Sequence, residues 1–153
     1  MRLSRRSLLS VAVTAPLVAV LAPVAAFATT PSIYAEDGVA VDGTDVVAYF
    51  TQSRPVPGDP AFSYDWNGAT WRFSTVANRD AFIADPMRYA PQYGGYCAYA
   101  VSEGYTASTT PEAWKIVDDK LYLNYSRRIQ RRWERDIPSR ISTADTNWPN
   151  VLD

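Results

Sequence analysis

Apolar residues gather in short runs in the part of the chain that follows residue 38. Residues 39–41 (VAV) and 46–50 (VVAYF) are β-branched and aromatic runs of the kind that strands contain. The polar residues between them, 42–45 (DGTD), are typical of a turn. The segment 54–60 (RPVPGDP) is rich in proline and holds a glycine, so we expect a connecting loop there.

Two β-hairpins are predicted further along the chain. Aromatic and polar residues alternate in 62–66 and again in 70–73, and an Asn-Gly pair stands at 67–68 between them. Asn-Gly between alternating runs is a strong hairpin signal, because both residues tolerate a positive φ. Residues 114–117 (WKIV) and 121–123 (LYL), joined by Asp-Asp-Lys, are the runs of the second hairpin.

Helices are predicted where capping residues precede mixed apolar and polar segments. Ser74 or Thr75 can cap a helix that runs to about residue 84. The side chains expected on its inner face are Ala77, Ala81 and Phe82. Pro86 opens a second, short helical turn, because a proline at the first helical position gives up no intrahelical hydrogen bond. Pro91 and the Gly-Gly pair at 94–95 then break the chain.

An arginine-rich helix is predicted after Ser126, ending near Ile137, and Pro138 opens a further helical segment that ends near residue 148. The arginines of the first helix are Arg127, Arg128, Arg131, Arg132 and Arg135. An apolar stripe of Ile129, Trp133 and Ile137 occupies another face of it. We interpret the arginines as a solvated face opposite this stripe, and binding of an anionic partner or phosphate is the alternative.

These elements predict a single small α+β domain, with two β-hairpins in antiparallel sheet packed against several short helices. The first 28 residues are excluded from it, and residues 29–37 are expected to be a flexible start. What remains is long enough for one domain with a substantial core.

Residues 1–28 have the pattern of a cleaved signal peptide. Three arginines precede an apolar run at 8–24 that two prolines interrupt, and 26–28 (AFA) offers small residues to a signal peptidase. A membrane span is the alternative, but the run is short and broken by proline. The segment 4–9 (SRRSLL) resembles a twin-arginine export signal, and a Sec signal is the other possibility. We therefore expect an exported protein, periplasmic or extracellular, with no stable membrane anchor after cleavage.

Charge and scarce residue types exclude several kinds of function. The whole chain carries a formal charge of −1, and removing residues 1–28 takes away three arginines and no acid, which leaves −4. A net acidic surface gives no general attraction to nucleic acid. The chain has no histidine, which excludes Ser-His and Cys-His catalysis, and Cys97 is its only cysteine, which excludes an internal disulfide. No paired carboxylates and no phosphate-binding glycine loop appear, so we lean towards a protein that is not an enzyme.

Cys97 is the residue whose chemistry the sequence leaves most open. With Met87 it offers two soft ligands, which can suffice for Cu(I). As a thiolate it can serve redox or nucleophilic chemistry if a helix N-terminus lowers its pKa, and the glycines at 94–95 can turn the backbone to place it there. The simplest interpretation is a small buried apolar residue, with Met87 as core filler.

A band of tyrosines surrounds Cys97 along the sequence. The residues predicted to line a ligand pocket with Cys97 are Tyr93, Tyr96, Tyr99 and Trp71, and Tyr89 and Tyr105 extend the same band. Aromatic rings can hold a planar or cationic ligand while the hydroxyl groups fix its orientation. Each tyrosine on its own is more simply a residue at the edge of the core. Asp45, ahead of the run 46–50, is expected to cap backbone N–H groups rather than to act in catalysis.

Several motifs together resemble a known family. The segment 73–89 (FSTVANRDAFIADPMRY) is similar to the core of the YHS domain, a small module named for a Tyr-His-Ser pattern. The motifs 45–50 (DVVAYF), 67–71 (NGATW) and 94–97 (GGYC) are similar to exported bacterial proteins of that family. The resemblance implies a YHS-type domain over residues 38–148 and a tail at 149–153.

The resemblance implies that metal-binding relatives carry cysteines at the positions that correspond here to Ala48, Ser74 and Asn78. None of these is a thiol, so we do not expect the metal site of the family. The resemblance still suggests a metal, with Cu(I) first, or a small ligand at Cys97 in a binding or accessory module. The alternatives are a thiol-dependent or redox-responsive protein that uses Cys97, and a structural domain that binds a protein partner without a ligand.

Overall fold

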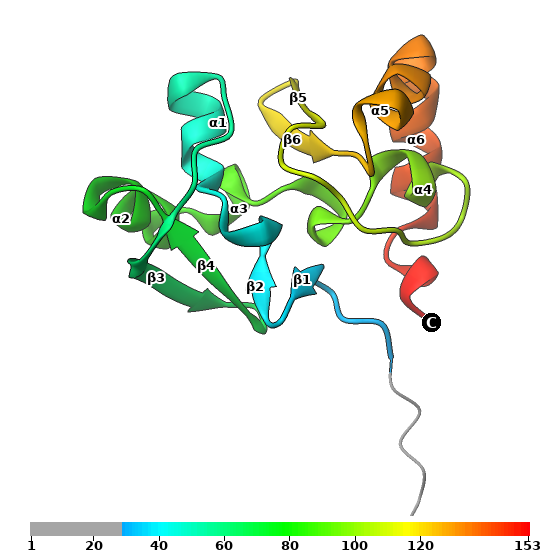
Figure 1. Ribbon diagram of the computed structural model, residues 1–153. Helices are drawn as coiled ribbons and strands as arrows, with labels where there is room; N and C mark the ends of the chain where they lie inside the picture. Colours follow the sequence, from blue (N-terminus) through cyan, green and yellow to red (C-terminus); the bar gives the residue numbers. More distant parts are fainter. Residues whose placement is uncertain (1–28) are drawn as a thin grey trace, which may run out of the picture.

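The computed structural model describes residues 29–153, so the predicted signal peptide lies outside the described residues. The fold is α+β, and both predicted hairpins are present (Figure 1). The elements in chain order are β1 (Ala35–Glu36), β2 (Val39–Ala40), η1 (Val41–Gly43), α1 (Val46–Gln52), β3 (Asp59–Trp66), β4 (Ala69–Phe73), α2 (Val76–Ala84), α3 (Pro86–Tyr89), η2 (Gln92–Gly95), α4 (Ala98–Ser102), β5 (Trp114–Val117), β6 (Lys120–Leu123), α5 (Arg127–Trp133), η3 (Glu134–Asp136), α6 (Ile137–Asn147) and η4 (Asn150–Leu152).

Four strands form the main sheet, in the order β1-β2-β4-β3. The β3–β4 hairpin turns at Asn67 and Gly68, whose φ values of 51° and 83° are the positive values that this two-residue turn requires. β2 joins β4 in the parallel direction, while the other pairs are antiparallel. Pro60 lies in β3, the edge strand, where a missing N–H leaves no neighbouring strand unpaired. β5 and β6 pair separately as the second hairpin.

The run 46–50 is a helix, so the prediction of a strand there was wrong. The side chain of Asp45 caps α1 by accepting hydrogen bonds from the N–H groups of Val47 and Ala48, at 2.9 and 3.3 Å. Residues 46–49 are all buried, so this apolar run had no polar face from which a period could be read. A short buried apolar run fits helix and strand equally well, and here the cap decides.

The predicted helix after Thr75 is confirmed as α2, and the predicted turn at Pro86 is α3. Thr75 is the capping residue, with its side chain accepting from the N–H of Asn78 at 3.1 Å. Phe82 is fully buried, as expected, and its ring centroid lies 5.0 Å from that of Trp71. Ala77 is exposed, so its placement on the inner face was wrong.

Two hydrophobic cores lie at the two ends of the molecule. The first is built by α1, α2 and the main sheet and contains Trp71, Phe73 and Phe82. The second lies around Trp133 and Tyr122, at the end where Figure 1 shows α4, α5 and α6 together. The side chains of both cores are almost completely removed from solvent. The chain reverses at η2.

The first described residues are fastened to the rest of the fold. The N–H of Tyr34 donates to the carbonyl of Gly94 at 2.9 Å, and the N–H of Thr30 donates to the carbonyl of Leu152 at 3.2 Å. Ile33 is buried and joins the first core. The expected flexible start at 29–37 therefore contains a short strand, β1, and long-range hydrogen bonds. Within residues 29–153 no helix has the length and apolar character needed to cross a bilayer.

The arginine-rich helix is confirmed as α5, which Ser126 caps by accepting from the N–H of Ile129 at 3.2 Å. Trp133 is fully buried, and the arginines of α5 are exposed, which confirms the division into a buried and a solvated face. A short 3₁₀ turn then leads into α6, which begins at Ile137 with Pro138 in its first turn.

Candidate functional site

Cys97 stands at the start of α4, where the chain leaves the turn of η2. Gly94 and Gly95 have φ values of 60° and 84°, a backbone shape that glycine adopts without strain, and they reverse the chain just ahead of it. The N–H of Cys97 donates to the carbonyl of Ala107 at 3.0 Å, which ties the start of α4 to the following loop. The expected position near a helix start is thus present.

Neighbouring polar groups hold the Cys97 thiol in place. Its sulfur accepts a hydrogen bond from the N–H of Tyr125 at 3.3 Å and donates to Oδ1 of Asn124 at 3.6 Å. Only 1% of the residue is exposed. Burial raises the pKa of the Cys97 thiol, even though backbone N–H groups of α4 and of Tyr125 act in the lowering direction. The thiol is therefore protonated at neutral pH, and a neutral thiol is a poor nucleophile.

A small hollow opens above this thiol. Its volume is about 220 Å³, and Cys97 lies at its base. The other lining residues are Tyr99, Ala100, Tyr105, Ala107, Tyr125 and Ile129. Tyr105 and Tyr125 are 53% and 57% exposed, so they form its rim. We call this feature the Cys97 hollow; its walls are aromatic and aliphatic, which is the usual lining of a small-molecule site.

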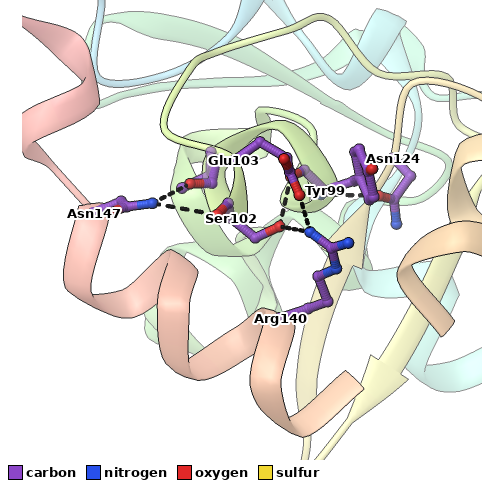
Figure 2. A network of polar contacts seen from close by, with 7 residues as sticks. Tyr99, Ser102, Glu103, Asn124, Arg140 and Asn147 are labelled. Carbon is purple, nitrogen blue, oxygen red and sulfur yellow. Dashed lines mark hydrogen bonds and ion pairs between the residues drawn. The ribbon is translucent and has the colours of Figure 1, made fainter. Parts of the chain in front are cut away.

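A polar network fixes α4, the helix that forms one wall of the hollow (Figure 2). Oδ1 of Asn124 accepts from the N–H of Tyr99 at 3.1 Å, while the side-chain amide of Asn147 donates to the carbonyl of Val101 at 2.8 Å. Arg140 donates to the hydroxyl of Ser102 at 3.1 Å and forms an ion pair with Glu103. Two elements distant in sequence, the end of β6 and α6, thereby hold the wall of the hollow.

Arg140 also stacks on the ring of Tyr99, with the guanidinium carbon 4.5 Å from the ring centroid. This contact fixes the orientation of a ring that lines the Cys97 hollow. A second hollow, of about 330 Å³, lies beside it and is lined by Tyr99, Arg132, Arg135, Asp136 and Arg140. A third hollow, of about 300 Å³, is lined by Tyr125, Ser126, Arg128, Ile129 and Arg132. The aromatic hollow thus borders a surface formed by arginines.

Two of the predicted pocket tyrosines lie in the second core instead. Tyr93 and Tyr96 are each 6% exposed and do not line the Cys97 hollow. The hydroxyl of Tyr93 donates to Asp145 at 2.8 Å, and that of Tyr96 donates to the carbonyl of Pro31 at 2.8 Å. Their rings pack against Trp148, at centroid distances of 6.0 and 6.2 Å. These contacts explain both tyrosines as structural residues.

Trp71 and Met87 also lie apart from Cys97. Trp71 is 1% exposed, packs in the first core and donates from Nε1 to the carbonyl of Trp66 at 3.0 Å. Met87, on α3, is 73% exposed and borders a wide groove of about 570 Å³ that Trp148 also lines. Of the other residues predicted for a ligand site, only Tyr99 lines the hollow of Cys97. Tyr93 lines the wide groove together with Met87, so Cys97 and Met87 border different hollows.

The three positions that correspond to metal cysteines in the resemblance gather around one carboxylate. Oδ2 of Asp45 accepts from the N–H and the hydroxyl of Ser74, at 2.8 and 2.6 Å, and from the side-chain amide of Asn78 at 2.7 Å. Oδ1 accepts from the N–H of Val47 and of Ala48, as described above. We call this arrangement the Asp45 network. It is fully buried at Asp45 and joins α1 to the end of β4 and to α2.

In the Asp45 network the donors and the carboxylate are paired with one another in hydrogen bonds, and this arrangement does not fit a soft metal ion. Cu(I) prefers thiolate and thioether sulfur, whereas this cluster presents oxygen and amide nitrogen. Within the part of the chain that the structure describes, no three Cys, Asp or Glu side chains gather as metal ligands would. The expected role of Asp45 as a cap is confirmed, and the network extends that role to two further elements.

Tyr125 and Asn124 are the site residues that sequence reasoning missed. Both follow β6 directly and precede the cap of α5. Residues at the end of a buried strand, just ahead of a helix, commonly face a neighbouring element, and that position is the signal that could have found them. The comparisons add no relative: no family model, no curated protein and no solved structure matches this chain.

Proposed function

We propose that the protein is an exported, non-catalytic binding or accessory module of YHS type that holds a small ligand in the Cys97 hollow. The observation that carries the proposal is the set of rings and methyl groups that line the hollow on a fixed frame. Aromatic side chains of this kind, exposed at the rim and restrained at the wall, are ready to bury apolar surface of a ligand. Export is supported by the pattern of residues 1–28.

The size of the hollow limits the ligand. Its volume of about 220 Å³ lies below the range in which sites for drug-sized molecules usually fall, which begins at about 300 Å³. A molecule of one or two rings, or of similar bulk, is the class that fits. The neutral thiol at the base acts as a small apolar contact in this proposal.

A titration with 2-naphthamide, a neutral two-ring probe, tests this proposal. We expect the probe to shift the methyl NMR signals of Ala100, Ala107 and Ile129, which line the hollow. Ala107→Leu should fill the hollow and abolish the shifts. Ala77→Leu, at an exposed position on α2, is the matched control and should leave them unchanged. Binding that Ala107→Leu does not weaken, or shifts confined to other parts of the molecule, would contradict a ligand site at Cys97.

Native mass spectrometry of the protein taken from its export compartment provides an independent test. A bound small molecule that Ala107→Leu removes supports the proposal and gives the mass of the ligand. A bound copper ion that Cys97→Ala removes would instead support the metal hypothesis and would overturn the proposal of an organic ligand.

A further inference from the structure

Three hollows around α5 share lining residues. The Cys97 hollow shares Tyr99 with the second hollow, and it shares Tyr125 and Ile129 with the third. The second and third hollows share Arg132. Arg132 therefore lines both hollows that share residues with the Cys97 hollow, and the lining changes from apolar to cationic within a few side chains.

Arginines gather at this surface although the exported chain is acidic. The residues from Thr29 onward carry −4, as derived above, yet half of their twelve cationic side chains fall between 127 and 140. Arg140 is occupied by its ion pair with Glu103. Among residues 29–153, Arg128, Arg132 and Arg135 have no ion pair within 4.0 Å. Their charge is thus available to an external anion.

The arginines do not face the hollow equally. Arg128 and Arg132 are one helical turn apart on α5, and both line the third hollow together with Ile129. Arg127 and Arg131, which are also one helical turn apart, border none of the three hollows. A general solvated face would not explain why two unpaired arginines line a hollow that shares Tyr125 and Ile129 with the Cys97 hollow.

We propose that the ligand is an anion with an apolar or aromatic body. Its body occupies the Cys97 hollow, and its carboxylate, phosphate or sulfate group is bound by Arg132, with Arg128 beside it. This inference rests on the proposed function, since it names the chemical class of the ligand for the same hollow. Arginine is suited to this role because its planar guanidinium can donate two parallel hydrogen bonds to an oxyanion.

A pair of probes that differ in charge tests the inference. 2-Naphthoate and 2-naphthamide have nearly the same shape, and only the first is an anion at neutral pH. We expect the exported protein to bind the naphthoate about five times more tightly in NMR titrations, the scale of one partly exposed ion pair. Raising the salt concentration should weaken the binding of naphthoate and leave the affinity for naphthamide unchanged.

Arg132→Gln should remove the preference for naphthoate and leave naphthamide binding intact. Arg131, on the same helix, borders none of these three hollows, so Arg131→Gln is the matched control and should keep the preference. Equal affinity for both probes, or a preference that Arg132→Gln does not reduce, overturns the inference while leaving the proposed function standing. If neither probe shifts the signals of the hollow, both the proposed function and this inference fail. Unchanged amide spectra of the two variants confirm that their folds are preserved.

Discussion

Replacing Asp45 by asparagine tests whether a buried carboxylate holds the first half of the fold together. The two side chains have nearly the same shape, so the change alters charge and hydrogen bonding without opening a cavity. In the native protein the carboxylate accepts five hydrogen bonds, from Val47, Ala48, Ser74 and Asn78. An asparagine has one oxygen and a donating amide group, so it cannot accept from both sides of the network.

The expected loss of stability follows from counting the donors that remain unpaired. If the new oxygen faces Val47 and Ala48, the amide group meets the donors of Ser74 and Asn78. The hydroxyl of Ser74 and the amide of Asn78 can turn to accept, but the N–H of Ser74 is fixed and loses its acceptor. A buried unpaired donor costs about 1–3 kcal/mol, and each hydrogen bond to a charged group is worth about 1.5–3 kcal/mol.

We therefore expect Asp45→Asn to lower the free energy of unfolding by about 3 kcal/mol. This is a large share of the total for a domain of this size, which is about 5–15 kcal/mol. Urea unfolding followed by tryptophan fluorescence measures it, because three tryptophans, Trp66, Trp71 and Trp114, pack in or against the first core. The midpoint should fall without a change in the slope.

Asp85→Asn is the matched control. Asp85 also caps a helix, but it is exposed and accepts only from the N–H of Arg88, at 3.3 Å. Asparagine caps about as well as aspartate, so we expect a change within about 0.5 kcal/mol. Asp45→Asn could instead change the free energy of unfolding as little as this control does. The cost of burying the charge would then cancel the free energy gained from its hydrogen bonds. That result would refute the assignment of the network as the link between α1 and α2.

Three further changes test other parts of the structure. Gly94→Ala places a Cβ against the carbonyl oxygen of Ser32, so it should prevent folding or lower the free energy of unfolding in urea by several kcal/mol. Gly104→Ala is the control: its Cβ meets open space, and it should cost about 1 kcal/mol because of its positive φ alone. Burial raises the pKa of Tyr122 to about 12, so its contribution to stability is complete below pH 10 and is lost as the pH rises from about 10 to 12. In urea unfolding, Tyr122→Phe should therefore lose less stability over this pH range than the unsubstituted protein does. Cys97 should react with iodoacetamide at neutral pH only after denaturation, and fast alkylation of the folded protein would favour the thiol-dependent alternative.

Local signals were sufficient where one or two residues decide the backbone. The turn at Asn67 and Gly68 was predictable because both residues adopt positive φ readily, and α2 was predictable because Thr75 caps it. The run 46–50 was read as a strand because its residues are β-branched and aromatic. Its helical form depends on the Asp45 network, which needs Ser74 and Asn78 from another part of the chain. The local cap of Asp45, which contacts with a distant segment hold in place, therefore decided the element that propensity missed.

The candidate site shows the same limit. Tyr99 lies two residues beyond Cys97, just after the start of α4, and shares the hollow with it. Tyr93 lies four residues before Cys97, but the chain reverses at Gly94 and Gly95, so its ring enters the second core. Nearness in sequence thus grouped residues that the turn separates. Tyr125 reaches the hollow only because β6 ends beside α4, and that pairing is not visible in either segment alone.

The two ends of the molecule differ in how far their polar and aromatic groups are already paired or buried. Around Asp45 every donor has its acceptor, and Asp45 is fully buried, so a ligand there would have to break existing hydrogen bonds without gaining new apolar contact. Around α5 the rings of Tyr105 and Tyr125 are more than half exposed, and Arg128 and Arg132 have no ion pair among the described residues. In the proposed function, binding there would add apolar burial and an ion pair and would break no hydrogen bond identified in the hollow. Under the proposed function, substitutions at α4 and α5 should therefore change affinity, while those around Asp45 should change stability.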